Sequence, residues 1–138
     1  MEESIIEQIN ELVKSRKIAQ LRELLESINS ADFPSLFEEI DDEDMVVIFR
    51  LLTKDKASDV FVELDPDLQE KLINNFTDKE LKVVVDDLFM DDTVDLIEEM
   101  PSSVVKRILK NIKASDRKVI NELLKFILSI NNILSWKM

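Results

Sequence analysis

Several residue types are missing from this chain of 138 residues, and each absence excludes a class of site. There is no cysteine, so disulfides, thiolate metal sites and a cysteine nucleophile are excluded. There is no histidine, which removes the commonest general base and zinc ligand. There is no glycine, so a glycine-rich phosphate loop cannot form. Carboxylates, hydroxyls and lysines remain as the groups that could carry chemistry.

The same scarcities bear on the fold. Tight hairpins and left-handed turns depend on glycine, asparagine or proline, and the chain has no glycine and three prolines. Short helices joined by Ser, Thr and Asp caps are therefore favoured. No signal peptide or apolar run of membrane-spanning length is present, so we expect a soluble, cytoplasmic chain.

Charge is unevenly distributed along the sequence. The net charge is −12, but residues 32–99 hold 22 acids and 6 bases, a net −16, whereas residues 100–138 hold 2 acids and 8 bases, a net +6. The middle of the chain should repel nucleic-acid phosphates and anionic lipids, and attract cations or a basic partner. The simpler interpretation is a solvated acidic face that keeps the protein soluble.

A 24-residue pattern of apolar residues runs four times through the chain. Its units start near Ser35, Asp59, Val83 and Arg107, and the apolar columns stay in register without a gap. Three of the columns are Leu36, Val60, Val84, Ile108; Ile40, Leu64, Leu88, Ile112; and Leu52, Phe76, Met100, Leu124. A fixed period of this length predicts an all-α solenoid of short helix pairs, armadillo-like, each pair burying its apolar face against its neighbours. Such arrays usually serve as binding or regulatory surfaces.

Local signals predict where the helices begin. Capping boxes at Ser4-x-x-Glu7 and Thr77-x-x-Glu80 each predict a helix start. Ser15 is expected to cap a second helix, and Asp65-Pro66 predicts an N-cap followed by proline at the first helical position. A further helix is expected to open at Asp91 or Asp92 and to end at Met100-Pro101.

The end of the chain leaves the repeat pattern. We expect a helical repeat domain over residues 1–125 and a divergent apolar tail over residues 126–138, which holds the single Trp. The tail could extend the last helix, with Asn131-Asn132 as a break, or dock onto the last repeat as a cap. It is too short to span a membrane.

The densest group of carboxylates comprises Asp86, Asp87, Asp91, Asp92 and Asp95. Asp91 and Asp95 are four residues apart and would share a face of a helix. Magnesium is often held by one or two carboxylates while it keeps several waters, so this pair is a candidate site. The alternative is that Asp residues at a helix start only cap the backbone and complement the helix dipole. No pocket-forming motif supports a carboxylate hydrolase, and we expect no enzymatic activity.

Two stretches carry a resemblance to a known family. Ala57-Ser-Asp-Val-Phe-Val-Glu-Leu-Asp-Pro-Asp-Leu and Val84-Val-Asp-Asp-Leu-Phe-Met-Asp-Asp-Thr-Val-Asp-Leu resemble the cytosolic N-terminal domain of the MgtE magnesium transporters. The resemblance extends over about residues 1–125. It implies a right-handed superhelix of short helices that precedes a pair of CBS domains and a transmembrane pore.

The resemblance also implies a function and a set of ligands. Mg²⁺ would bind between this domain and the CBS domains, neutralise facing acidic surfaces and hold the pore closed. The positions that match the family's N-domain ligands are Asp59, Asp91 and Asp95. Asp59 stands where the family often has Glu, so its side chain is one methylene shorter.

The sequence departs from the family after Leu123-Leu-Lys-Phe, where no CBS pair or pore follows. We therefore expect no transport by this chain alone, weak Mg²⁺ binding, and either a fragment or a free-standing domain. A homodimer is possible, as the family's transporters are dimers. The alternative function is a free-standing protein-interaction scaffold without a cation role, since similar helical repeats occur in a flagellar motor switch protein.

Overall fold

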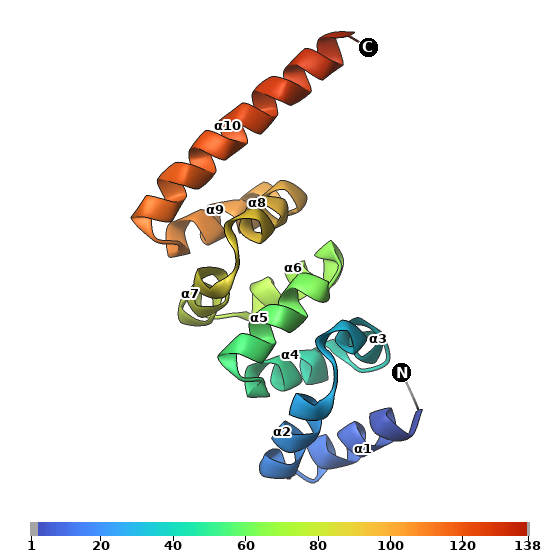
Figure 1. Cartoon of the computed structure of the whole chain (residues 1–138). Helices are drawn as coiled ribbons and strands as arrows, with labels where there is room; N and C mark the ends of the chain where they lie inside the picture. The colour runs from blue at the N-terminus through green and yellow to red at the C-terminus, as the bar shows by residue number, and fades with distance from the viewer. Residues whose placement is uncertain (1–2, 138) are drawn as a thin grey trace. The chain divides into compact units, whose positions relative to one another are not determined.

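The computed structural model describes the backbone of residues 3–137 and the side chains of residues 4–125. Within that part the chain is helical and has no strand (Figure 1). The helices are α1 (Glu3–Lys14), α2 (Ile18–Ser27), the 3-10 helix η1 (Ser30–Asp32), α3 (Phe33–Glu38), α4 (Asp42–Leu51), α5 (Lys54–Glu63), α6 (Pro66–Asn75), α7 (Asp78–Asp87), α8 (Met90–Glu99), α9 (Ser102–Asn111) and α10 (Ala114–Lys137). The all-α class expected from the sequence is confirmed.

The helices from α4 onward follow a constant step. Each of α4 to α9 has ten residues, two residues join it to the next helix, and each helix therefore starts 12 residues after the one before. Two such steps make the 24-residue period of the sequence. Contacts follow the same spacing, because α4 packs on α6, α7 on α9 and α8 on α10. Residues one period apart are thus found on helices that touch within a unit.

The helix ends explain how the chain turns without glycine. Helices commonly end in a left-handed residue, usually glycine; here the C-cap residues are extended, with ψ from 134° at Ile28 to 161° at Ile112. These C-caps are the apolar residues Ile28, Leu52, Leu64, Leu88, Met100 and Ile112. All but Leu88 are buried, so each helix ends by placing an apolar side chain into the core. Among the described residues only Arg16 has a positive φ, 57°.

The chain divides into two compact units, residues 1–75 and residues 76–138. In the first unit, α1 packs on α2, and α5 packs on η1 and α3. Its core contains fully buried side chains on four of these elements, namely Leu21, Leu25, Phe33, Leu36, Met45, Ile48, Phe61 and Leu72. The Lys56 ammonium donates to the carbonyl of Ile28 and lies 5.8 Å from the centre of the Phe33 ring, which ties α5 to the segment that follows α2.

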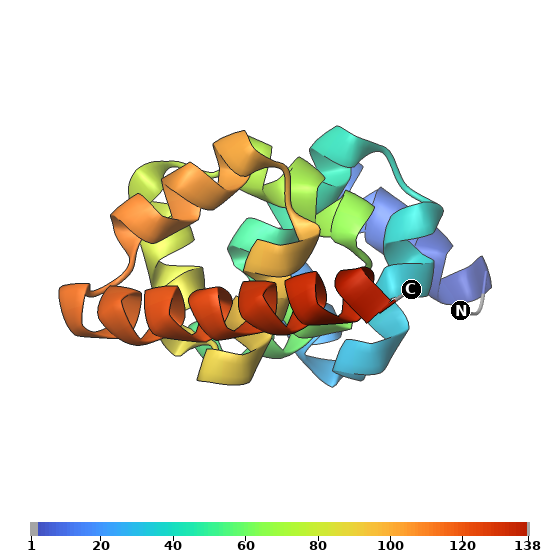
Figure 2. The ribbon, with the colours of Figure 1, turned by 90° about the horizontal axis from the view of Figure 1, so that it is seen from above.

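The second unit is built from α7 to α10. Leu81, Ile108 and Ile120 are its most deeply buried side chains, contributed by α7, α9 and α10. The Arg107 guanidinium donates to Asp78 Oδ1 at 3.1 Å and to the carbonyl of Phe76, which fixes α9 to the start of α7. α10 is a single helix, seen as the red ribbon of Figures 1 and 2.

Most of the predicted helix starts are confirmed. The backbone N–H of Leu68 donates to Asp65 Oδ1 at 3.0 Å, and both hydrogen bonds of the Thr77–Glu80 capping box are present. Four predictions are wrong, and the next two paragraphs give their physical reasons.

Two of these errors lie near the N-terminus. Ser4 lies inside α1 and does not cap it, because the helix already includes Glu3. Ser15 does not cap α2: its hydroxyl donates back to the carbonyl of Glu11 at 2.7 Å, and Lys17 takes the N-cap position. A serine near a helix end often bonds a preceding carbonyl in this way.

The other two errors lie in the second unit. α8 opens earlier than Asp91 or Asp92, with Phe89 as its N-cap residue. α10 continues through Asn131-Asn132 without the predicted break, since the backbone hydrogen bonding of a helix tolerates asparagine. Whether the tail packs as a cap depends on side chains that lie outside the described residues.

Candidate functional site

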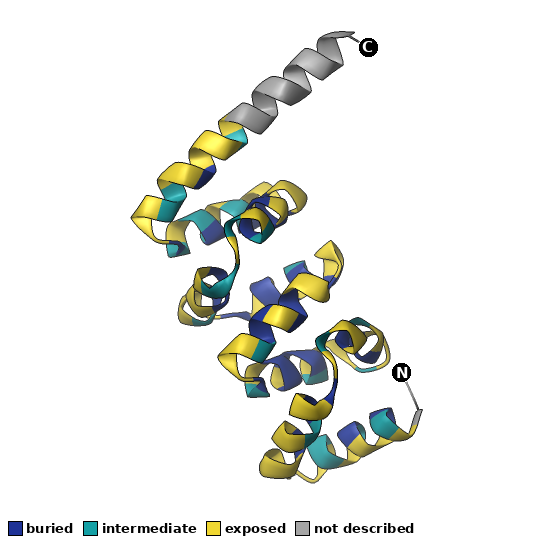
Figure 3. Ribbon diagram, in the orientation of Figure 1, coloured by how far each residue is buried: buried dark blue, intermediate teal, exposed yellow. Residues whose placement is uncertain are grey.

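The candidate metal-binding residues Asp91 and Asp95 lie on the exposed face of α8. Val94 and Ile97 turn the opposite face of this helix into the core of the second unit, so the hydrophobic period decides which residues remain outside. Asp91 and Asp95 are both exposed, and their spacing of four residues places them one turn apart (Figure 3). The structure therefore brings these two predicted ligands together on one surface.

Asp92 lies between them in sequence and is half-buried. Its pKa is raised above the ordinary value, first by burial of the carboxyl and then by repulsion from the charges of Asp91 and Asp95. A carboxylate in the first turn of a helix is usually stabilised by the helix dipole. The raised pKa shows that desolvation and negative neighbours outweigh that effect at the start of α8.

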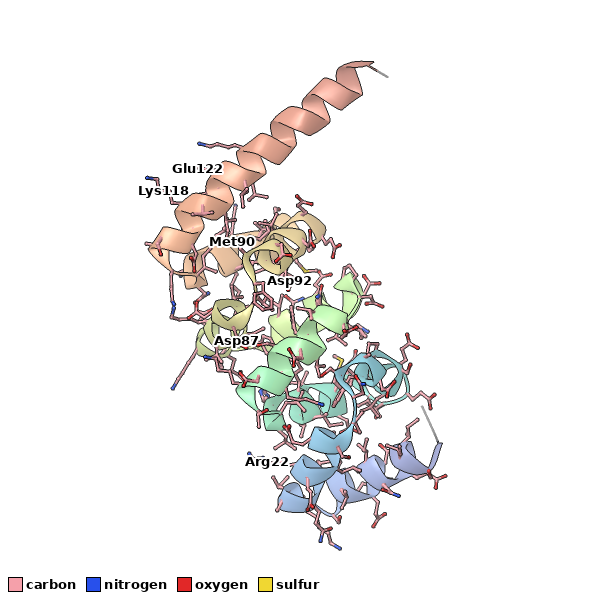
Figure 4. The ribbon with its side chains drawn as sticks, viewed as in Figure 1. Arg22, Asp87, Met90, Asp92, Lys118 and Glu122 are labelled. Carbon is pink, nitrogen blue, oxygen red and sulfur yellow. The ribbon has the colours of Figure 1, made fainter. Side chains whose placement is uncertain are left out.

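The acidic character of this surface extends beyond α8. Seven acids and no base occur between Val83 and Val105. The nearest base that compensates is Lys82, whose Nζ lies 3.1 Å from Asp86 Oδ2 within α7. Figure 4 labels Asp87 and Asp92 on the two sides of the joint between α7 and α8. A cation approaching the exposed face of α8 thus meets an excess of carboxylates.

The third predicted ligand, Asp59, belongs to the other unit. It is exposed on α5, where Val60 and Phe61 turn into the core. Glu63, four residues further on, is also exposed and shares its face, so α5 carries a second carboxylate pair of the same spacing. Asp59 is described with its own unit, and its joint action with Asp91 and Asp95 stays a prediction.

The arrangement fits a hydrated divalent cation better than a closed metal site. No group of three or more acidic ligands converges closely enough to hold a metal ion among the residues whose side chains are described. The pair on α8 supplies two carboxylates, and Mg²⁺ commonly keeps several waters when one or two carboxylates hold it. Further ligands would have to come from another surface, which agrees with the weak binding expected for this chain.

Sequence reasoning missed Phe89, whose side chain is 77% exposed. It occupies the N-cap position of α8, and its side chain makes no capping hydrogen bond. The signal was present in the sequence, because the corresponding positions in steps of 12 residues are polar. They are Asn29, Asp41, Thr53, Asp65 and Thr77.

One property of the helices bears on location. In the described part of the chain, no helix combines the length and the hydropathy required to cross a lipid bilayer.

Comparisons with known proteins point to one group. Residues 28–127 match the family described as MgtE intracellular N domain. A crystal structure of the cytosolic domain of the Mg²⁺ channel MgtE in complex with ATP is 24% identical, with a TM-score of 0.74, and the match covers 84% of this chain and 48% of that one. A crystal structure of the soluble part of a magnesium transporter is 18% identical, with a TM-score of 0.75, and the match covers 88% of this chain and 48% of that one.

These matches agree on the fold, and the chain spans about half the length of the solved structures that it resembles. Among curated proteins, none matches this chain.

Proposed function

Because the chain belongs to the MgtE intracellular N domain family, we propose that it is the Mg²⁺-sensing regulatory domain of an MgtE-type magnesium transporter. The family is that of an intracellular transporter domain and not of an enzyme. The observation that carries the proposal is the exposed carboxylate pair Asp91 and Asp95 on α8, within a surface that lacks bases.

The proposed mechanism follows from electrostatics. An acidic surface that faces another acidic surface, here that of the CBS domains, repels it when no cation is present. Mg²⁺ bound between the two would neutralise both and favour the closed arrangement. A ligand shifts such an equilibrium only by its difference in affinity for the two states. A site divided between two surfaces meets that condition, because it exists only when they are together.

Asp59, Asp91 and Asp95 are the proposed ligands from this chain. Mg²⁺, when bound, would supply positive charge between apposed carboxylates. This chain alone offers half of each site, so we expect it to bind Mg²⁺ weakly and to transport nothing. Asp91 and Asp95 are expected to contribute more than Asp59, whose shorter side chain reaches less far than the Glu that is common in the family.

An NMR titration of amide shifts with Mg²⁺ at constant ionic strength tests the proposal. We expect saturable shifts at Asp91, Asp95 and Asp59, and their loss in the double variant Asp91→Asn/Asp95→Asn. A matched control is Glu7→Gln/Glu11→Gln, because these two acids are also exposed and four residues apart on α1. Shifts that stay linear and spread evenly over all acidic helices would mean diffuse screening, and the proposed site would be wrong.

A further inference from the structure

The joint that opens α8 breaks the pattern of the other joints. Where other helices have a polar N-cap residue, α8 has Phe89, and the aromatic ring is 77% exposed. A residue that cannot cap leaves a helix about 1 kcal/mol less stable than Ser, Thr, Asp or Asn would. Neither burial nor capping within this unit accounts for a phenylalanine here. A local rule broken at an exposed position is typical of a surface that meets a partner.

The surroundings of Phe89 restrict the chemistry of that partner. Four aspartates lie within three residues of it in sequence, namely Asp86, Asp87, Asp91 and Asp92. An exposed aromatic ring among carboxylates is complementary to a surface that combines apolar side chains with lysine or arginine. An acidic or purely polar surface would leave either the charges or the ring without compensation.

The second unit itself carries a surface of that kind on α10. Val119 is 45% exposed and Leu123 is 38% exposed, and their spacing of four residues places them on one face. Lys118 and Lys125 are exposed on the adjoining face of the same helix, beside Glu122. Figure 4 labels Lys118 and Glu122 on α10. Residues 100–138 hold eight of the chain's bases and only two of its acids.

We propose that a second copy of this chain docks here, with Phe89 of one copy against Val119 and Leu123 of the other. The aspartates around Phe89 then face Lys118 and Lys125 of the partner copy. Both surfaces belong to the same compact unit, so two copies can exchange the contact reciprocally. A two-fold pair is the commonest closed arrangement of identical chains, and it uses each surface once per copy. The pairing requires no metal ion.

Sedimentation velocity of the whole chain in EDTA, over a wide concentration range, tests the pairing. We expect a reversible dimer that Phe89→Ser weakens at least tenfold, with the same effect from Val119→Ser/Leu123→Ser. The matched control is Val62→Ser, because Val62 is 42% exposed on α5 of the other unit. Serine is a good N-cap residue, so Phe89→Ser should keep the helix content measured by circular dichroism. A chain that stays monomeric at every concentration would overturn the proposal, as would a dimer that Phe89→Ser leaves unchanged.

Charge reversal tests which surfaces meet. Asp91→Lys/Asp95→Lys and Lys118→Glu/Lys125→Glu should each abolish the dimer, because like charges then face one another. An equimolar mixture of the two variants should form a heterodimer, since both of its reciprocal contacts again join opposite charges. Failure of the mixture to associate would overturn the assignment of these surfaces. Added salt should weaken the wild-type dimer, and a dimer that salt strengthens would contradict the role of charge.

Discussion

Two joints of the second unit have the same length and the same place in the 12-residue step, yet they are built differently. At the first, Phe76 is buried, Thr77 caps α7, and the Arg107 guanidinium donates to the Phe76 carbonyl. At the second, Leu88 is only half-buried and Phe89 leaves its ring in solvent. The first joint satisfies the rules of helix initiation, and the second sacrifices them. The difference indicates that the start of α8 is shaped by something outside the unit.

The largest effect is expected from the apolar residue of each joint. Phe76→Ala should lower the free energy of unfolding by about 3–5 kcal/mol, because it leaves a cavity at a buried aromatic position. Leu88→Ala removes a half-buried side chain and should cost clearly less. Urea denaturation of both variants measures the difference. Equal losses would show that the two joints contribute alike.

The capping residue of the first joint comes next. Thr77→Ala removes a hydroxyl that accepts from the Glu80 N–H at 3.1 Å, and should cost about 1 kcal/mol of stability. The matched substitution in the second joint, Phe89→Ala, removes no capping bond and should change stability by less than about 0.5 kcal/mol. These measurements belong at concentrations where the chain is monomeric. A larger loss at Phe89 than at Thr77 would reverse the comparison.

The second joint should also be open to repair. Phe89→Thr supplies a side-chain oxygen for the free N–H groups of α8 and should stabilise the monomer by up to about 1 kcal/mol. Phe89→Ala is the control that lacks this oxygen, so the difference between the two variants isolates the cap. If threonine and alanine give the same stability, the start of α8 has no need of a cap.

The smallest effect concerns the charge of Asp92. Its pKa in the folded chain is raised, so the ionised form opposes folding and this cost disappears as the pH falls toward the ordinary value. Asp92→Asn should therefore be more stable than the wild type near neutral pH. The gap should narrow in mildly acidic buffer, where the wild type binds its proton. Urea midpoints across this pH range measure the trend, and a gap that widens as the pH falls would give the opposite sign.

Much of the fold could be predicted because its signals are local. The Thr77–Glu80 capping box and the Asp65–Pro66 start each depend on residues within one turn, and both appear in the structure as expected. The apolar columns identified positions such as Leu64 and Ile112, which prove to be the buried C-caps. Periodicity thus gave the positions of the helices and of the core.

The errors arose where one signal had two possible uses. Ser15 suggested a cap, but its hydroxyl bonds the preceding turn instead. Asp91 and Asp92 suggested a helix start because aspartates usually stand there, whereas α8 begins with an aromatic N-cap residue. The pair Asp91 and Asp95 could be placed on one face from spacing alone. Its exposure, and the raised pKa of Asp92, depend on how α8 packs, which spacing does not give.

The constant helix length has a consequence for how such a chain can change in evolution. One residue inserted into a ten-residue helix rotates everything beyond it by about 100°, which turns core residues outward. Removal of 24 residues, from the start of one helix to the start of the second helix after it, rejoins equivalent positions and leaves the alternation of joints intact. Relatives of this chain should therefore differ in length by whole helix pairs and rarely by single residues within a helix.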